Sequence, residues 1–296
     1  MSAAAVTAPA GPQEDHGLFG PDSATWQLHT DPLIGPAGLR ALLLQALHPL
    51  AVHVVAVHSR FREETWQRLQ RTGEYVDTTT FAATGEAHRA AAAVRAVHTR
   101  IRGVDPDSGL EYGADDEDLL LWIHCALVDS ILDVVSRGRP AARAVSAREA
   151  DRYVAEQVTS AELVGVRPEV VPASRADLRA YFEEVRPQLR VTREAREVAS
   201  YVVAPGLPAR MALTTPAVPV WMGVAGLAVG SLPAWARRMY ALPGLRATDA
   251  ASEAATTAGL RGLRLAMARM QGQVPGVELS APRRRAMALM AERIPA

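Results

Sequence analysis

Four side chains that could do chemistry together lie in the segment RLQRTGEYV, residues 68–76: Arg68, Arg71, Thr72 and Tyr75. On a helix turning about 100° per residue, the last three lie about −60°, +40° and −20° from the first. They form one polar stripe roughly a quarter of a turn wide. Such a set of donors can stabilise negative charge that develops during a reaction. A solvated helix face would show the same pattern, so other parts of the sequence must distinguish the two.

The histidines supply the candidate metal ligands, and all of them lie in the first part of the chain: His16, His29, His48, His53, His58, His88, His98 and His124. His48, His53 and His58 recur every five residues, so on a continuous helix they would lie on three different faces. A chelating trio is therefore not expected, and the HExxH pattern of zinc hydrolases is absent.

His98 and His124 differ from the others because each interrupts an apolar helix face, the first beside Val94 and the second beside Leu127. Either imidazole could be an ordinary core side chain. Either could also be the axial ligand of a haem, which needs only one histidine and an apolar pocket. No CxxCH motif occurs, so a haem would be bound without covalent attachment. Arg71 and His98 are separated by one helix, a turn and a second helix, as distal and proximal residues are in globin-like folds.

His48 directly precedes Pro49, whose ring removes a helical hydrogen bond. The imidazole could act as a base, close a pocket or satisfy the loosened backbone, and the sequence leaves these roles open. The single cysteine, Cys125, lies in an apolar run and excludes an internal disulfide framework.

The composition favours helices: 49% of the 296 residues are hydrophobic, 5% are aromatic, and alanine is abundant. The net charge of +0 gives no support for a nucleic-acid partner, and every fixed side-chain cation is an arginine because no lysine occurs. Residues 1–17 read as a disordered lead-in without a secretory signal, so a cytoplasmic protein is expected. Residues 18–296 read as one all-α domain.

Helical periodicity and stop signals predict the following elements: one helix over 35–61 kinked at Pro49, a second from 62 that ends between 73 and 77, and others over 85–103, 114–138, 146–164, 174–186 and 192–202. No strand pattern of useful length occurs. Residues 211–236 carry no charge but are interrupted by prolines. A buried helix or a lid over an apolar pocket is the preferred interpretation, and peripheral membrane contact stays open.

Six segments, taken in order, resemble the oxygenase MpaB family, which includes the latex-clearing proteins: GPAGLRALLLQALHPLAVHVVAVHS, RLQRTGEYV, VRAVHTRIRG, LLLWIHCALVDSIL, RADLRAYFEEV and LPAWARRMYAL. The resemblance covers roughly residues 18–245. It implies a globin-like helical core that holds haem b. It also implies an enzyme that uses dioxygen to cleave a carbon–carbon double bond in an apolar substrate.

Carried over residue by residue, the family's arginine and threonine match Arg68 and Thr72. Its proximal histidine best matches His98, with a shorter intervening segment here, and His124 is the second choice. Latex-clearing proteins can place a distal lysine on the iron, but Arg71 occupies that position. A guanidinium has no lone pair for a metal, so the sixth position should hold water, dioxygen or nothing.

The sequence therefore predicts a haem b-dependent oxygenase whose partners are dioxygen and a small apolar, unsaturated substrate. The catalytic candidates are Arg68, Arg71, Thr72 and His48. The cofactor-binding candidates are His98, with Arg68, Tyr75 and His124, and an arginine could instead pair with a haem propionate. A haem sensor or carrier without turnover, or a helical protein without cofactor, are the alternatives.

Overall fold

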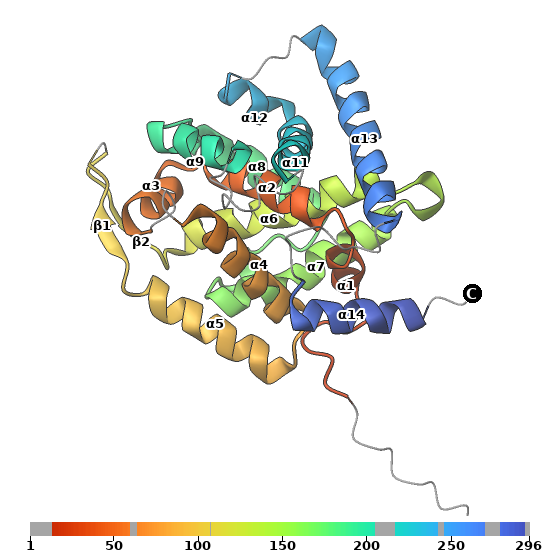
Figure 1. Ribbon diagram of the computed structural model, residues 1–296. Helices are drawn as coiled ribbons and strands as arrows, with labels where there is room; N and C mark the ends of the chain where they lie inside the picture. Colours follow the sequence, from red (N-terminus) through yellow and green to blue (C-terminus); the bar gives the residue numbers. More distant parts are fainter. Residues whose placement is uncertain are drawn as a thin grey trace, which may run out of the picture.

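The computed structural model describes residues 14–59, 64–106, 108–204, 217–241, 246–269 and 279–293. Within these ranges the chain is almost entirely helical, which confirms the predicted all-α domain (Figure 1). The helices are α1 (Ala24–His29), α2 (Ile34–Gln45), α3 (Pro49–His58), α4 (Thr65–Phe81), α5 (Thr84–His98), α6 (Glu117–Gly138), α7 (Ala147–Val164), α8 (Arg175–Val185), α9 (Arg193–Val203), α11 (Ala217–Ser231), α12 (Ala234–Met239), α13 (Arg246–Arg269) and α14 (Ala281–Glu292).

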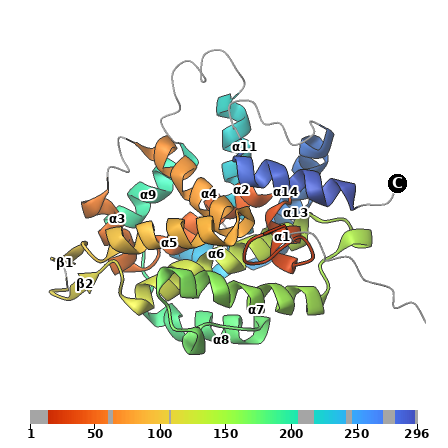
Figure 2. The same ribbon diagram turned by 90° about the horizontal axis from the view of Figure 1, so that it is seen from below.

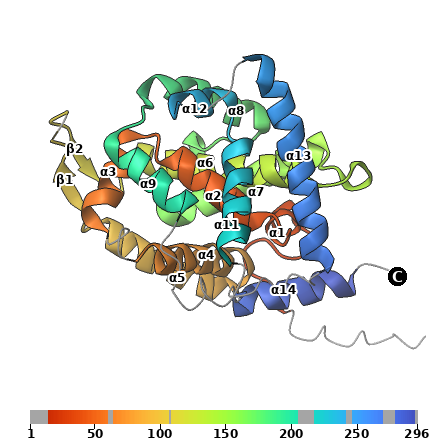
Figure 3. The ribbon, with the colours of Figure 1, turned by 45° about the horizontal axis from the view of Figure 1, so that its top comes forward.

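The centre of the fold is the pair formed by α6 and α2, which pack along each other (Figures 1 and 3). α6 is apolar over most of its surface, so Trp122, Ile131 and Val134 are buried against neighbours on several sides. α11 and α13 close one side of this pair, and α7 packs against α6, α5 and α1 (Figure 2). The core is therefore built around the segment that carries His124.

Two helical segments reach the length and hydropathy of a membrane span, namely α6 alone and the bent pair α2–α3. In α6, 67% of the apolar window is buried inside the protein. The core helix of a globular domain meets the same criteria, so this composition follows from the central place of α6.

A charged side chain, Arg40, lies inside the core with 2% of its surface exposed. Its guanidinium donates to Ser130 Oγ at 2.7 Å and to the Ser231 carbonyl at 3.0 Å, and it pairs with Asp129 at 2.8 Å. These contacts join α2 to α6 and to the end of α11. A buried cation is tolerated because its donors are matched by partners on two other elements.

The single kinked helix predicted over 35–61 is wrong: the chain forms α2 and α3, which bend by 104° relative to each other. Pro49 begins α3 instead of interrupting a helix, and the His48 ring accepts a hydrogen bond from Ala51 N at 3.4 Å as its N-cap. Proline is favoured at the first helical position, where its missing N–H costs nothing. His48 therefore starts a new helix.

The predicted end of the second helix, between residues 73 and 77, is also wrong, because α4 continues to Phe81. Gly73 lies within the exposed part of α4, where a glycine costs only about 1 kcal/mol. The later turns are stabilised by Phe81, which is buried edge-on against Trp26 with ring centroids 5.4 Å apart. Tertiary packing outweighs the local stop signal.

The third helix is shorter than predicted, since α5 ends at His98 and not at Gly103. Gly103 lies in a strand, β1 (Arg102–Val104), which pairs antiparallel with β2 (Glu111–Gly113). Gly103 faces Tyr112 across the hairpin, and a side chain there would collide with the phenol ring. The sequence pattern gave no sign of this hairpin, because its strands are only three residues long.

The uncharged segment 211–236 is described from residue 217, so residues 211–216 lie outside the described ranges. α11 packs against α2, α9 and α13, and Ala225 and Ala228 are fully buried. Its amino-terminal end is exposed at Val218, Val220 and Met222. The carboxyl half of α11 is thus the buried helix that was expected.

Most of the expected lead-in, residues 1–13, also lies outside the described ranges. Asp15 is described, and its carboxylate accepts hydrogen bonds from the Thr84 backbone and hydroxyl, each at 2.9 Å. It therefore satisfies the first N–H group of α5 and the hydroxyl of the same residue.

Candidate active site

Arg68 lies near the amino-terminal end of α4, which packs beside α5 in all three views (Figures 1–3). Its side chain is half-buried. The Nη1 group donates to the hydroxyl of Ser59, the residue that follows α3. Ser59 in turn donates to the Val55 carbonyl at 2.6 Å. The guanidinium is thus fixed between α4 and the end of α3.

The charge of Arg68 is not compensated within the described part of the chain, where no carboxylate lies within ion-pair distance of it. Burial lowers the pKa of Arg68, and the neighbouring Arg71 cation lowers it further. A guanidinium nevertheless stays protonated in proteins. A desolvated cation without a counter-charge attracts an anionic group.

The predicted polar stripe divides into two parts. Arg71 is exposed and pairs with Glu64 at 3.1 Å, and the exposed Thr72 donates its hydroxyl to the Arg68 carbonyl at 2.9 Å. Arg68 and Tyr75 are the half-buried members. The structure therefore gives Arg71 and Thr72 local partners, and only the other two residues are turned towards the interior.

Tyr75 lies two turns after Arg68, and burial raises its pKa although the Arg95 cation on α5 opposes this. Arg95 donates to the Leu163 carbonyl in the last turn of α7. Cations are favoured at helix carboxyl ends, so Arg95 has a structural role there.

His98 is the last residue of α5 and is half-buried. Its Nδ1 atom is buried and has no hydrogen-bond partner among the residues that the structure describes. Burial lowers the pKa of His98, and Asp115 acts in the opposite direction. A neutral imidazole with an unused ring nitrogen is what a metal-bearing cofactor needs.

His124 lies in the middle of α6, and burial lowers its pKa to about 4. The ring keeps part of its surface accessible and makes no hydrogen bond within the described ranges. It is therefore a second neutral imidazole without a polar partner. The structure puts His98 at a helix end near the hairpin and His124 in the central helix.

His48 has a defined tautomer, because its Nδ1 accepts the Ala51 N–H and the proton must then lie on Nε2. The ring lies 6.3 Å from Trp122, and burial lowers its pKa. With Nδ1 in use, the imidazole is a helix cap and an Nε2–H donor. Of the three roles that the sequence left open for His48, these contacts support the one of satisfying the backbone.

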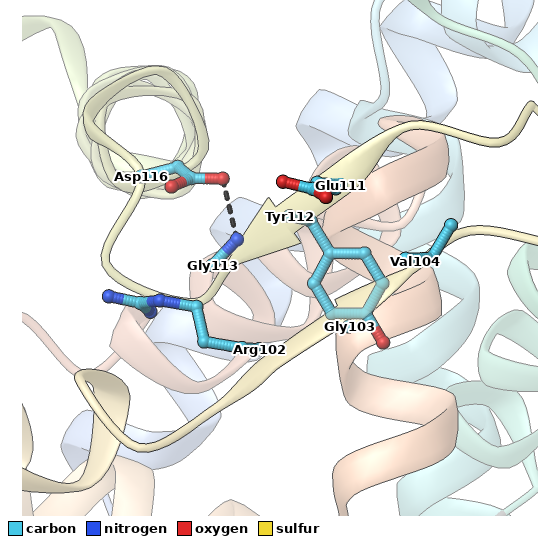
Figure 4. A pocket seen from close by; sticks show the side chains of 7 residues that line it. All are labelled: Arg102, Gly103, Val104, Glu111, Tyr112, Gly113 and Asp116. Atoms are coloured by element: carbon cyan, nitrogen blue, oxygen red, sulfur yellow. Dashed lines mark hydrogen bonds between the residues drawn. The ribbon is translucent and has the colours of Figure 1, made fainter.

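A pocket of about 440 Å³ opens on the β1–β2 hairpin (Figure 4). It is lined by Arg102, Gly103, Val104, Glu111, Tyr112, Gly113 and Asp116. The Tyr112 ring lies across Gly103 (Figure 4). The Tyr112 hydroxyl is 2.9 Å from His58 Nε2. None of the predicted site residues lines this pocket.

Sequence reasoning missed Ser59 and Asp115, which act on Arg68 and His98 respectively. Neither belongs to a recognisable motif. A serine just after a helix is a common capping residue, but its contact with Arg68 depends on how α3 and α4 are placed.

The residues present fit a haem. Among the described residues, no group of three or more histidine, cysteine, aspartate or glutamate side chains could hold a metal ion. Haem iron needs only one protein ligand, and the half-buried imidazole of His98, which burial keeps neutral, is of the type that can fill this role. Arg68 supplies a half-buried cation on the adjacent helix, with no paired carboxylate in the part of the chain that the structure describes.

The depressed pKa of His124 makes stability depend on pH. Between pH 6.5 and pH 4 the His124 imidazole is protonated in the unfolded protein, where its pKa is near 6.5. It stays neutral in the folded protein, where its pKa is about 4. The contribution of the neutral His124 side chain to the free energy of unfolding is fully present above pH 6.5 and is lost as the pH falls towards 4. We expect His124 to account for about 2 kcal/mol of the loss in unfolding free energy between pH 7 and pH 5.

Urea unfolding of the haem-free protein at pH 5, 6 and 7 measures this dependence. His124→Leu should flatten the pH slope, whereas His88→Leu, at an exposed position of α5, should leave it unchanged. The same slope in wild type and His124→Leu would show that His124 is not desolvated in the folded state.

Comparison with known proteins bears on the chain as a whole. The family described as ER-bound oxygenase mpaB/B'/rubber oxygenase, catalytic domain, matches residues 26–269. The comparisons with curated proteins and with solved structures gave no match. The matched range begins within α1, ends with α13 and includes the catalytic and cofactor-binding candidates, which are His48, Arg68, Arg71, Thr72, Tyr75, His98 and His124. The chain therefore belongs to the mpaB and rubber oxygenase family.

Proposed function

We propose that the protein is a haem b-dependent oxygenase that acts on an apolar, unsaturated substrate with dioxygen and cleaves a carbon–carbon double bond. Family membership supports the oxygenase class. The haem rests on one juxtaposition: a neutral imidazole ends α5, and the neighbouring α4 carries a half-buried guanidinium that has no paired carboxylate among the residues that the structure describes. The apolar, unsaturated substrate rests on the resemblance to the family.

In this proposal His98 holds the haem iron, and His124 is the alternative ligand. The haem, when bound, supplies the iron that activates dioxygen. Arg71 cannot bind the iron, because a guanidinium has no free lone pair.

Arg68 stabilises negative charge that develops during oxygen activation. Its field is strong because the side chain is partly removed from water, and its position is fixed by Ser59 before any ligand arrives. Tyr75 keeps its proton, since burial raises its pKa, and can donate a hydrogen bond from the same side of α4. Thr72 supports the local geometry through the Arg68 carbonyl.

A haem carrier or sensor would also need His98, but it would not need a desolvated arginine. An unpaired guanidinium fits either negative charge that develops during turnover or a haem propionate, and only the first role affects the rate of a reaction. Arg68 variants therefore separate turnover from simple binding.

The test is oxygen uptake by haem-loaded protein with isoprenoid alkenes, with carbonyl products followed by mass spectrometry. Arg68→Ala should lower kcat by about 10²- to 10³-fold, on the scale of losing one preorganised donor, and should retain haem. Arg148→Ala, at an exposed position on α7, is the matched control and should behave as wild type. A protein that binds haem but shows equal turnover with and without Arg68 would contradict this role.

A further inference from the structure

Ser59 connects the end of α3 to the side chain of Arg68. Its backbone is extended at φ −133° and ψ 152°, so the helix stops there. Its hydroxyl donates to the Val55 carbonyl at 2.6 Å, which uses the only hydroxyl proton. The Oγ lone pairs are then directed to an external donor, and the Arg68 Nη1 group fills that role.

The dipoles of the two helices explain why Arg68 needs this contact. Arg68 lies near the amino-terminal end of α4, where the positive end of the helix dipole disfavours a cation. The carboxyl end of α3 carries the opposite partial charge, and Ser59 with the Val55 carbonyl lies at that end. The guanidinium is therefore drawn away from its own helix end and towards α3.

The contact uses one N–H group of a guanidinium that has five. Because the guanidinium is planar and rigid, fixing one Nη group also fixes the directions of the remaining N–H groups. Without Ser59, the half-buried cation would have no side-chain partner within the described ranges and could adopt other rotamers.

We propose that Ser59 is a positioning residue that orients Arg68 towards the ligand side of the site and so sets its preference for anionic over neutral ligands. This inference rests on the proposed function, in which Arg68 faces the haem. It assigns to the α3 terminus a part in oxygen activation, although no atom of Ser59 touches the reacting groups.

Ligand binding to the ferric, haem-loaded protein tests the proposal, with fluoride as the anionic probe and imidazole as the neutral one. Both are titrated by their absorption spectra in wild type, Ser59→Ala, Ser59→Thr and Arg68→Ala. We expect Ser59→Ala to weaken fluoride binding by roughly tenfold, as for loss of a hydrogen bond to a charged group. Imidazole binding should stay the same, and Ser59→Thr should restore the fluoride affinity.

The matched control is Ser200→Ala, whose exposed hydroxyl makes a similar local bond to the Glu197 carbonyl at 2.7 Å. The inference would be overturned if Ser59→Ala lost equal affinity for fluoride and imidazole. It would also be overturned if Arg68→Ala lost fluoride affinity and Ser59→Ala did not. Either result would leave the proposed function intact. A wild-type protein that binds no haem would overturn both.

A second measurement does not depend on haem. Phenylglyoxal modifies accessible guanidinium groups, and peptide mass spectrometry reports the extent at Arg68 in the haem-free protein. Labelling of Arg68 should rise in Ser59→Ala and fall back in Ser59→Thr. Equal labelling in wild type and Ser59→Ala would show that Ser59 does not hold the side chain, and would overturn the inference.

Discussion

His98→Ala protein supplied with haem is expected to lose the Soret band of the wild type or to show it strongly shifted. The imidazole at the end of α5 is the proposed axial ligand, and the alanine side chain cannot bind iron. The fold should survive, because the buried Nδ1 atom of His98 makes no hydrogen bond within the described ranges. Circular dichroism and absorption spectra of the same samples measure both properties.

The matching variant His124→Ala shows whether His98 or His124 is the axial ligand. It should retain the Soret band, since His124 is the second choice of ligand. If the band instead survives in His98→Ala and disappears in His124→Ala, the ligand is on the central helix. A folded, haem-supplied wild type without any Soret band would contradict the haem proposal.

The second large effect is expected at Asp31, whose side chain is 1% exposed. Its carboxylate pairs with Arg139 at 3.3 Å and with Arg264 at 3.1 Å, and it accepts the Leu33 N–H at 3.1 Å. Removing one partner of a buried ion pair leaves uncompensated charge and costs about 3–5 kcal/mol. We expect Asp31→Ala to lower the urea unfolding free energy by about this amount.

Asp22→Ala is the matched control, because it also removes an aspartate that pairs with an arginine. That pair, Asp22 with Arg293 at 2.6 Å, is exposed to solvent, and such pairs contribute little to stability. If Asp31→Ala unfolds no more easily than Asp22→Ala, the contacts of Asp31 with Arg139 and Arg264 do not stabilise the fold.

The helices that the sequence predicted well are those with their own local boundaries. Ser146 forms a capping box with Glu149 at the start of α7, and Ser174 and Thr192 cap α8 and α9. Gly138 ends α6 where the stop signal placed it. Such boundaries depend on neighbouring residues only, so a single sequence contains them.

The boundaries that were predicted wrongly depend on distant residues. α4 extends to Phe81, which packs on Trp26, and the chain after α5 enters a hairpin in which Gly103 pairs with Tyr112. The break at Pro49 could be a kink or a new helix, and the His48 cap decides for the latter. Local propensities differ too little between these outcomes to identify the right one.

For the candidate site, the sequence predicted the residue types better than their environments. The helical stripe correctly groups Arg68 with Tyr75, but periodicity alone does not separate them from Arg71 and Thr72, which face solvent. That separation depends on Glu64 and on the packing of α4 against α5. The Ser59 contact crosses a helix break, and no periodic pattern reports such a contact.

The pairing of α2 with α6 has a consequence for how the protein is made. α2 is complete at Gln45, but its main partner is not complete until Gly138, and α11 and α13 follow much later. At ribosomal rates of about 5–20 residues per second, synthesis of the chain from Gln45 to Gly138 takes roughly 5 to 20 seconds. During this time α2 cannot pack against α6. During that interval the nascent chain presents an apolar helix of the kind that chaperones bind. The arrangement that places α2 at the centre of the domain thus leaves its apolar surface uncovered until the later helices have been made.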